Sequence, residues 1–307
     1  MNNGKIQLSM LLDSSSREAV LEEVRKNWLF HYEESLFSQV ENAFGLICML
    51  FDGNFSGYRK CNTEYHNLTH TFDALLAVSR LMDGLFFVRE KFSPELSLNL
   101  HLAALLHDTG YIQEDWDREG TGAKYTSVHV ERSNDFLRKN YKAFHLKESD
   151  IEVISQLILC TGIKGDAIKN LSEDMAMAGA ILATGDLLGQ MSDRAYLEKL
   201  LFLYYEFKEA GIEGFNTTFD ILRKTLSFYE ITKEKLDSDF FSVYDDLVYH
   251  FKERYNIPEN LYMVAIDNQI KYLVDIIEDE STNFRNKLKR LDLEKIELDY
   301  TISREYV

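Results

Sequence analysis

Residues 94–108 read PELSLNLHLAALLHD, and this stretch determines much of what the sequence predicts about the fold. Pro94 and the glutamate after it are typical of the first turn of an α-helix, where proline and acidic side chains are favoured. Apolar residues then dominate, and Gly110 favours an end to the helix just beyond. The stretch therefore predicts a buried helix that delivers a histidine and an aspartate, His107 and Asp108, at its end.

The same helical pattern continues along the chain in both directions. Apolar residues return at helical spacing from Leu68 to about Glu90. Only two prolines and 15 glycines occur, fewer than a turn-rich β-sandwich needs. We therefore predict an all-α fold, a single large helical bundle. The other helices are expected at about 14–30, 33–51, 127–139, 148–161 and 172–189, followed by helices over 193–291 that break near 211–214 and at Pro258.

Composition restricts the partners and the compartment. Acidic residues number 51 and basic residues 34, so the net charge is −17, which argues against long nucleic acid as a partner. The three cysteines form no CxxC pair, which argues against a thiolate zinc site or a disulfide framework. No apolar run is long enough for a secretory signal or a bilayer span. We expect a cytoplasmic protein that makes no membrane contact of its own.

The pair at the end of the 94–108 helix is the first candidate for chemistry. A carboxylate beside so apolar a segment is unfavourable unless a cation or hydrogen-bond donors compensate it. His107 and Asp108 can both turn toward one metal ion, and such ligands suit zinc, iron, manganese or magnesium. The alternative is an aspartate that caps the helix and a histidine that is satisfied within the core. An isolated pair of this kind favours the alternative.

A second candidate cluster precedes the first. Residues 64–73 read EYHNLTHTFD, in which His66 and His70 are four apart and so share a face on a helix. One of them can bind a metal while the other faces a substrate. Asp73 can orient a ring nitrogen from behind. The alternatives are two core histidines and an aspartate on a solvated face.

A third segment holds one charge among small and apolar residues. Asp186 is the only charged residue between Asp174 and Asp193, within the run AMAGAILATGDLLGQ at 176–190. The small residues predict a buried helix that other helices approach closely. A lone carboxylate in such a helix needs a partner, which can be a metal ion or, alternatively, an arginine or a hydroxyl group.

The order H…HD…D in these contexts resembles the HD-domain superfamily of metal-dependent phosphohydrolases. YHNLTH followed by FDAL is most similar to the motif of the 3′,5′-cyclic nucleotide phosphodiesterases, and the resemblance covers about residues 65–193. It implies an all-helical fold, and it implies His66 as the proton donor to the leaving oxygen. It also implies that Asp108 bridges to a second metal ion. The ligands that it implies for the first metal ion are His70, His107, Asp108 and Asp186.

The number of metal ions stays open at this point. Tyr111 stands where the phosphodiesterase motif continues to a further histidine, and no histidine occurs near Cys160, where dinuclear bacterial members often have one. His129 lies where bacterial HD-domain proteins place a histidine that helps to hold a second metal. An exposed helix histidine is the alternative. The resemblance implies one or two divalent ions, with zinc, iron, manganese, magnesium and nickel as candidates.

These residues lead to a functional hypothesis. We expect a metal-dependent phosphohydrolase in which a metal-activated hydroxide attacks a small phosphoester, a 3′,5′-cyclic nucleotide first, with His66 and Asp108 as catalytic residues. One alternative is a nucleotidase or other phosphomonoesterase on the same scaffold. Another is a non-catalytic HD signalling or interaction module that retains its metal. The small phosphorylated substrate is the expected partner, and a homodimer is compatible with the sequence.

The remaining features are assigned as follows. We expect an N-terminal tail over residues 1–13, the HD-type metal-binding helical domain over 14–215, and C-terminal helices over 216–307 packed on the same domain. The stretch 294–307 favours a short strand or a tail. The loop at 120–124 can close over phosphate through its amides and Lys124, or it is a plain solvated loop. Four histidines have no partner pattern and are expected to be structural: His31, His101, His145 and His250.

Overall fold

The computed structural model describes residues 6–162, 167–279 and 281–294. Within these residues the chain forms α-helices and short 3₁₀ turns, with one isolated β-bridge and no strand, so the predicted all-α fold is confirmed. The helices are α1 (Arg17–Leu29), α2 (Phe37–Phe51), α3 (Leu68–Leu85), α4 (Pro94–Leu106), α5 (His129–Asn140), α6 (Glu148–Leu159), α7 (Glu173–Ser192), α8 (Tyr196–Glu209), α9 (Thr218–Ser238), α10 (Leu247–Tyr255) and α11 (Leu261–Glu278).

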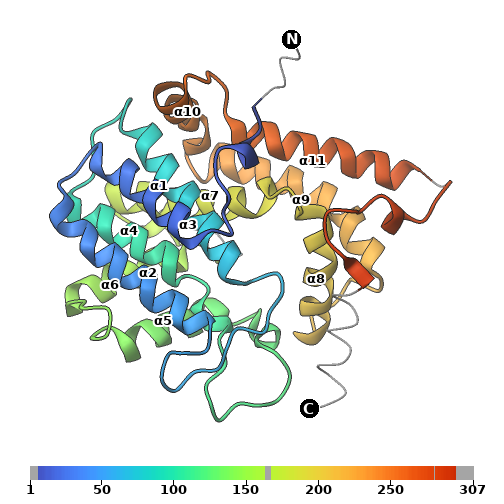
Figure 1. Ribbon diagram of the computed structural model, residues 1–307, viewed down its shortest axis with the longest axis horizontal. Coiled ribbons are helices and arrows are strands. Elements are labelled where there is room, and N and C mark those ends of the chain that lie inside the picture. The colour runs from blue at the N-terminus through green and yellow to red at the C-terminus, as the bar shows by residue number, and fades with distance from the viewer. Residues whose placement is uncertain (1–5, 163–166, 280, 295–307) are drawn as a thin grey trace.

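The helices form one bundle around α3 and α7 (Figure 1). The first six helices gather on one side of the view, and α8, α9 and α11 lie on the other. Most side chains of α3 and α7 are buried, and these two helices pack against each other. On the other side of the bundle, α11 packs on α7 and α9 packs on α8. Among the described residues, no helix combines the length and the apolarity that crossing a membrane requires. Most of the expected strand or tail at 294–307 lies outside the described residues.

Some predicted helix limits differ from the structure, and the helix expected over 68–90 ends at Leu85. The second helix, expected from Glu33, begins as a 3₁₀ turn and becomes α-helical at Phe37. The expected breaks near 211–214 and at Pro258 are present, but the chain also breaks between α9 and α10. Phe241 and Ser242 both adopt positive φ there, at 56° and 54°. Non-glycine residues rarely adopt this conformation, so the sequence carries no glycine or proline signal at this break.

The small residues of α7 bring α3 unusually close. A Cβ atom at Gly185 would lie 2.5 Å from Cγ2 of Val78, and one at Gly189 would lie 2.8 Å from the carbonyl carbon of Asp73. Only glycine leaves room for the α3 backbone at this distance. The prediction that this helix is closely approached and buried is confirmed. The close packing also sets the separation between the functional side chains of α3 and α7.

We expect Gly189→Ala to destabilise the protein by about 1–3 kcal/mol, because the added methyl group meets backbone atoms that cannot rotate away. Gly45→Ala is the matched control, since nothing lies within 4 Å of the Cβ position at this exposed site in α2. There alanine should stabilise the helix by about 0.5–1 kcal/mol. Urea unfolding of both variants measures the difference, and a Gly189→Ala midpoint at or above the parent's would contradict the packing argument.

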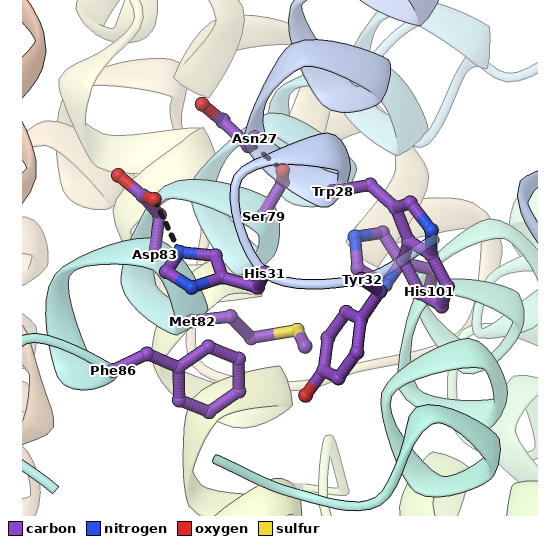
Figure 2. Close-up of a pocket in the computed structure, with 9 residues that line it drawn as sticks. All are labelled: Asn27, Trp28, His31, Tyr32, Ser79, Met82, Asp83, Phe86 and His101. Atoms are coloured by element: carbon purple, nitrogen blue, oxygen red, sulfur yellow. Dashed lines mark hydrogen bonds and ion pairs between the residues drawn. The ribbon is translucent and has the colours of Figure 1, made fainter. Parts of the chain in front are cut away.

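A buried carboxylate outside the candidate site ties three helices together. Asp83 of α3 accepts hydrogen bonds from His31 at 2.6 Å, from His250 at 2.7 Å and from Arg254 at 2.6 Å. Burial alone would raise the pKa of Asp83, but these donors hold it below its ordinary value. The adjacent cavity of about 10 Å³ is no larger than a water molecule needs (Figure 2). This cluster links α1, α3 and α10 rather than binding a ligand.

Candidate metal centre

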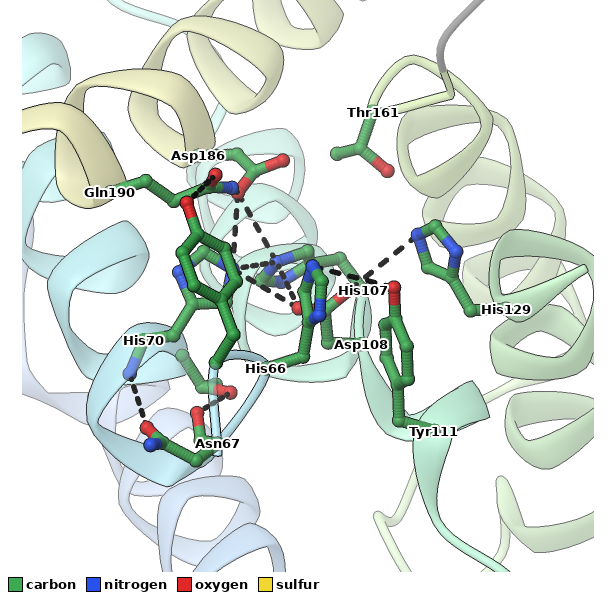
Figure 3. A network of polar contacts seen from close by, with 12 residues as sticks. His66, Asn67, His70, His107, Asp108, Tyr111, His129, Thr161, Asp186 and Gln190 are labelled. Atoms are coloured by element: carbon green, nitrogen blue, oxygen red, sulfur yellow. Dashed lines mark hydrogen bonds and ion pairs between the residues drawn. The ribbon is translucent and has the colours of Figure 1, made fainter. Parts of the chain in front are cut away.

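Three helices deliver the predicted site residues to one place (Figure 3). The side chain of Asn67 caps α3 by accepting a hydrogen bond from the amide of His70 at 3.2 Å, which holds His70 in the first turn. His107 is the residue that ends α4, and Asp108 follows it in a turn. Asp186 lies within α7, across from α3. The structure therefore brings together residues that are more than 100 positions apart.

The ligand atoms of these residues converge closely. Nε2 of His70 lies 3.3 Å from Nε2 of His107 and 3.2 Å from Oδ1 of Asp186. The distance from His107 Nε2 to the same carboxylate oxygen is 3.7 Å. Oδ2 of Asp108 lies 3.1 Å from His70 Nε2 and 3.3 Å from His107 Nε2. Two imidazoles thus face two carboxylates across a space of a few ångströms.

Backbone contacts aim one of the rings. The Nδ1–H group of His107 donates to the carbonyl oxygen of Ala104 at 2.9 Å, so Nε2 points at the carboxylates. Gln190 holds Asp186 by donating to Oδ1 at 2.6 Å, and it accepts a hydrogen bond from the hydroxyl of Tyr65 at 3.1 Å. Such outer contacts fix the orientation of ligands in metal sites.

The electrostatics of the cluster favour a positive charge. Burial by itself lowers the pKa of His70, but Asp108 and Asp186 outweigh it and raise that pKa to about 9. Burial likewise opposes ionisation of His107, yet the same carboxylates raise its pKa well above the ordinary value. Burial would raise the pKa of Asp108 and of Asp186, but the imidazoles lower both. Positive charge is therefore stabilised where rings and carboxylates meet.

The donor set fits a divalent metal ion. The ligand atoms of His70, His107 and Asp186 all lie within 4.8 Å of one another. Bonds of about 2.0–2.2 Å from zinc to nitrogen or oxygen place neighbouring ligands about 3–3.5 Å apart, close to the spacing found here. In addition, Oδ2 of Asp108 is buried without a hydrogen bond. A cation bound between the imidazoles and the carboxylates would satisfy this oxygen.

His129 approaches the same cluster from α5. A Cβ atom at Gly110 would collide with the carbonyl oxygen of His129, so glycine permits this close approach. His129 donates from Nδ1 to the carbonyl oxygen of Thr126 at 2.7 Å, and its Nε2 lies 3.7 Å from Oδ1 of Asp108. Burial lowers the pKa of His129, which favours the neutral ring that a metal ligand requires. Asp108 thus directs Oδ2 toward His70 and His107 and Oδ1 toward His129.

His66 lies beside the cluster and is held by a partner that sequence reasoning missed. Glu206 of α8 is 1% exposed, and its Oε2 lies 2.6 Å from Nδ1 of His66, while its Oε1 accepts from the amide of Tyr65 at 2.8 Å. Tyr111 stacks on the His66 ring at 4.2 Å between centroids, and its hydroxyl lies 3.3 Å from Nε2. The only available signal for Glu206 is that it is the one charge between Lys199 and Lys208.

Two further candidates from the sequence, Lys124 and Asp73, lie outside the cluster of His70, His107, Asp108 and Asp186. Lys124 of the 120–124 loop donates to Asp117 at 2.6 Å and to the carbonyl oxygen of Glu119, and it does not line the pocket described below. Lys124 therefore contacts residues of its own segment in this structure, and the idea that the loop closes over phosphate stays a prediction. Asp73 is half-buried next to His70, and burial raises its pKa to about 7.

A pocket with a volume of about 320 Å³ opens from this cluster. His66, Asp108, Tyr111, His129 and Asp186 line one part of it. Residues of α7, α8 and α9 and the residues at 160–162 line much of the remainder. The volume lies in the range that holds a small organic ligand. Four of the site residues predicted from the sequence therefore border a space that a small ligand can occupy: His66, Asp108, His129 and Asp186.

A family model matches a large part of this chain. A search of the curated proteins found no match to this chain. The sequence model of the Npun_R2479-like family matches residues 18–240, which is more than half of the chain and includes every residue of the cluster. The chain belongs to the Npun_R2479-like family.

Proposed function

We propose that this protein is a metal-dependent hydrolase of small phosphoesters. The observation that carries the proposal is the convergence of His70, His107 and Asp186 on one point, with Asp108 against both imidazoles. The resemblance of their sequence context to HD-domain phosphohydrolases supports the same reaction. A divalent ion bound there would supply a nucleophilic water near neutral pH and would neutralise charge on the phosphoryl group.

The protein's own side chains would do the remaining work. His66 lies with its ring centre 5.8 Å from that of His70, and Glu206 holds its Nδ1. An imidazolium held in this way can donate its Nε2 proton to the departing oxygen. Tyr111 stacks on one face of the ring and limits its rotation. The attack of water on phosphorus breaks the bond to the leaving oxygen, which takes the proton from His66.

The proposal covers phosphodiesters, cyclic nucleotides among them, and phosphomonoesters. It is favoured over a non-catalytic metal-retaining module because a structural ion does not need the His66–Glu206 pair beside it. Elemental analysis and anomalous scattering would count the ions. Turnover of cyclic nucleotides, nucleoside monophosphates and simple esters with manganese, nickel, magnesium, zinc or iron tests the reaction. A metal-loaded protein that is inactive on the whole panel would overturn the proposal and favour the module.

Glu206→Gln should lower kcat by about 10–100-fold and leave KM nearly unchanged, because the amide cannot stabilise a charged His66 ring as the carboxylate does. Steady-state kinetics on the best ester of the panel would measure both constants. Glu230→Gln is the matched control, since Glu230 is exposed on α9 and does not line the pocket. Equal kcat for Glu206→Gln and the parent would remove Glu206 from the mechanism.

A further inference from the structure

The pocket changes character away from the metal cluster. Beyond His66 and Asp186, many of its lining residues come from α8, α9 and the turn between them. We call this part the outer limb. Aliphatic and aromatic side chains dominate it, among them Leu203, Phe207, Phe215, Ile221, Phe228 and Ile231.

Two of these side chains are exposed at the surface. Phe228 is 45% exposed and Ile231 is 55% exposed, and they lie three residues apart on one face of α9. Large apolar groups at the rim of a pocket are typical of a surface that contacts an apolar ligand. The apolar character of the outer limb thus extends from the interior to its opening.

Three polar side chains along this path already have partners within the protein, and Tyr196, Thr232 and Lys235 also line it. Gln190 uses its amide nitrogen on Asp186 and accepts from Tyr65 with its oxygen. The hydroxyl of Thr225 donates to the carbonyl oxygen of Ile221 at 2.8 Å, and the ammonium of Lys224 donates to the carbonyl oxygen of Gly214. A nucleobase would bury ring nitrogens and amino groups against these walls, which is unfavourable without partners. A hydrocarbon chain needs none.

We infer that the preferred substrate is an amphiphile, a phosphoester of a long-chain or prenyl alcohol. This inference rests on the proposed function for the head group and on the outer limb for the chain. The phosphate lies at the metal cluster, and the hydrocarbon chain lies along the outer limb toward Phe228 and Ile231. Hydrolysis adds water to phosphorus and breaks its bond to the alkyl oxygen. That oxygen takes the proton from His66, so the alcohol is released.

Binding of alkylphosphonates tests the chain without requiring turnover, because their phosphorus–carbon bond is not hydrolysed. Calorimetry with butyl-, octyl- and dodecylphosphonate, at one fixed manganese concentration and below micelle formation, should show tighter binding with length. Each buried methylene is expected to contribute about threefold to fourfold. Butyl to octyl then amounts to a gain on the order of 10²-fold.

Variants at the opening locate the chain. The double variant Phe228→Ser, Ile231→Ser should weaken octylphosphonate binding by about tenfold or more, since both apolar contacts are removed. Both side chains are exposed, so folding should be preserved. Met49→Ser is the matched control, because Met49 is 45% exposed on α2 and outside the pocket. It should bind octylphosphonate as the parent does.

The outcomes separate the two proposals. Chain-length-dependent binding without turnover of any phosphoester would support the amphiphile and overturn the hydrolase. If the protein hydrolyses cyclic nucleotides and the affinity for alkylphosphonates does not change with alkyl length, the hydrolase is supported and the amphiphile is overturned. The amphiphile is also overturned if no alkylphosphonate binds, or if the double variant binds octylphosphonate as tightly as the parent.

Discussion

Asp186→Asn is expected to remove the divalent ion and to lower turnover by at least about 10³-fold, since a metal ion supplies several kcal/mol of transition-state stabilisation. Asparagine keeps the size of the side chain but not its charge. Oδ1 of Asp186 lies 3.2 Å from Nε2 of His70 and 3.7 Å from Nε2 of His107, so the change acts at the centre of the cluster. The effect on activity should therefore follow directly from the loss of the ion.

Metal content and activity must be measured on the same samples. Elemental analysis of the purified variant should give a small fraction of the parent's ion content, and circular dichroism should show the same helical signal. Asp174→Asn is the matched control, because Asp174 is exposed in the first turn of the same helix. If Asp186→Asn keeps its full ion content, the proposed ligand set is wrong.

His66→Ala is expected to keep the ion and to lower turnover by about 10²–10⁴-fold, the usual range for a general acid. The charged partner of the ring is Glu206, whose Oε2 lies 2.6 Å from Nδ1 of His66. Ion content and turnover should therefore separate in this variant, whereas they fall together in Asp186→Asn.

The leaving group provides a sharper test of the role of His66. Nitrophenolate is a stable leaving group that departs from phosphorus without needing a proton. His66→Ala should therefore hydrolyse a nitrophenyl ester almost as fast as the parent does. An ester of an aliphatic alcohol should show the whole loss. Equal losses on both esters would mean that His66 positions the substrate instead of donating a proton.

Local pattern was sufficient to predict much of the fold. The start of α4 at Pro94, the helix break at Pro258 and the close burial of α7 all follow from residue types whose conformational limits apply in any protein. The break at Phe241 and Ser242 does not follow from residue type. Packing imposes a left-handed backbone there, on two residues that do not prefer it.

The candidate site divides in the same way. His107 and Asp108 stand out because a charge beside an apolar helix needs compensation, and Asp186 stands out for the same reason. Glu206 and Gln190 were missed, although both contact site residues. Their side chains resemble ordinary surface residues in the sequence. The contact between Lys124 and Asp117 is likewise one that spacing in the sequence does not reveal.

The sequence by itself determined the helical fold and singled out the residues proposed to carry the chemistry, because helix periodicity and the penalty for lone buried charges are local properties. Only the tertiary structure decided which groups touch. It brought Glu206 against His66, set Asp186 across from His70, and joined the cluster to an apolar outer limb between α8 and α9. The Asp186–His70 contact depends on how closely the glycine-containing α7 packs on α3, and all of these contacts are properties of two surfaces and not of one segment.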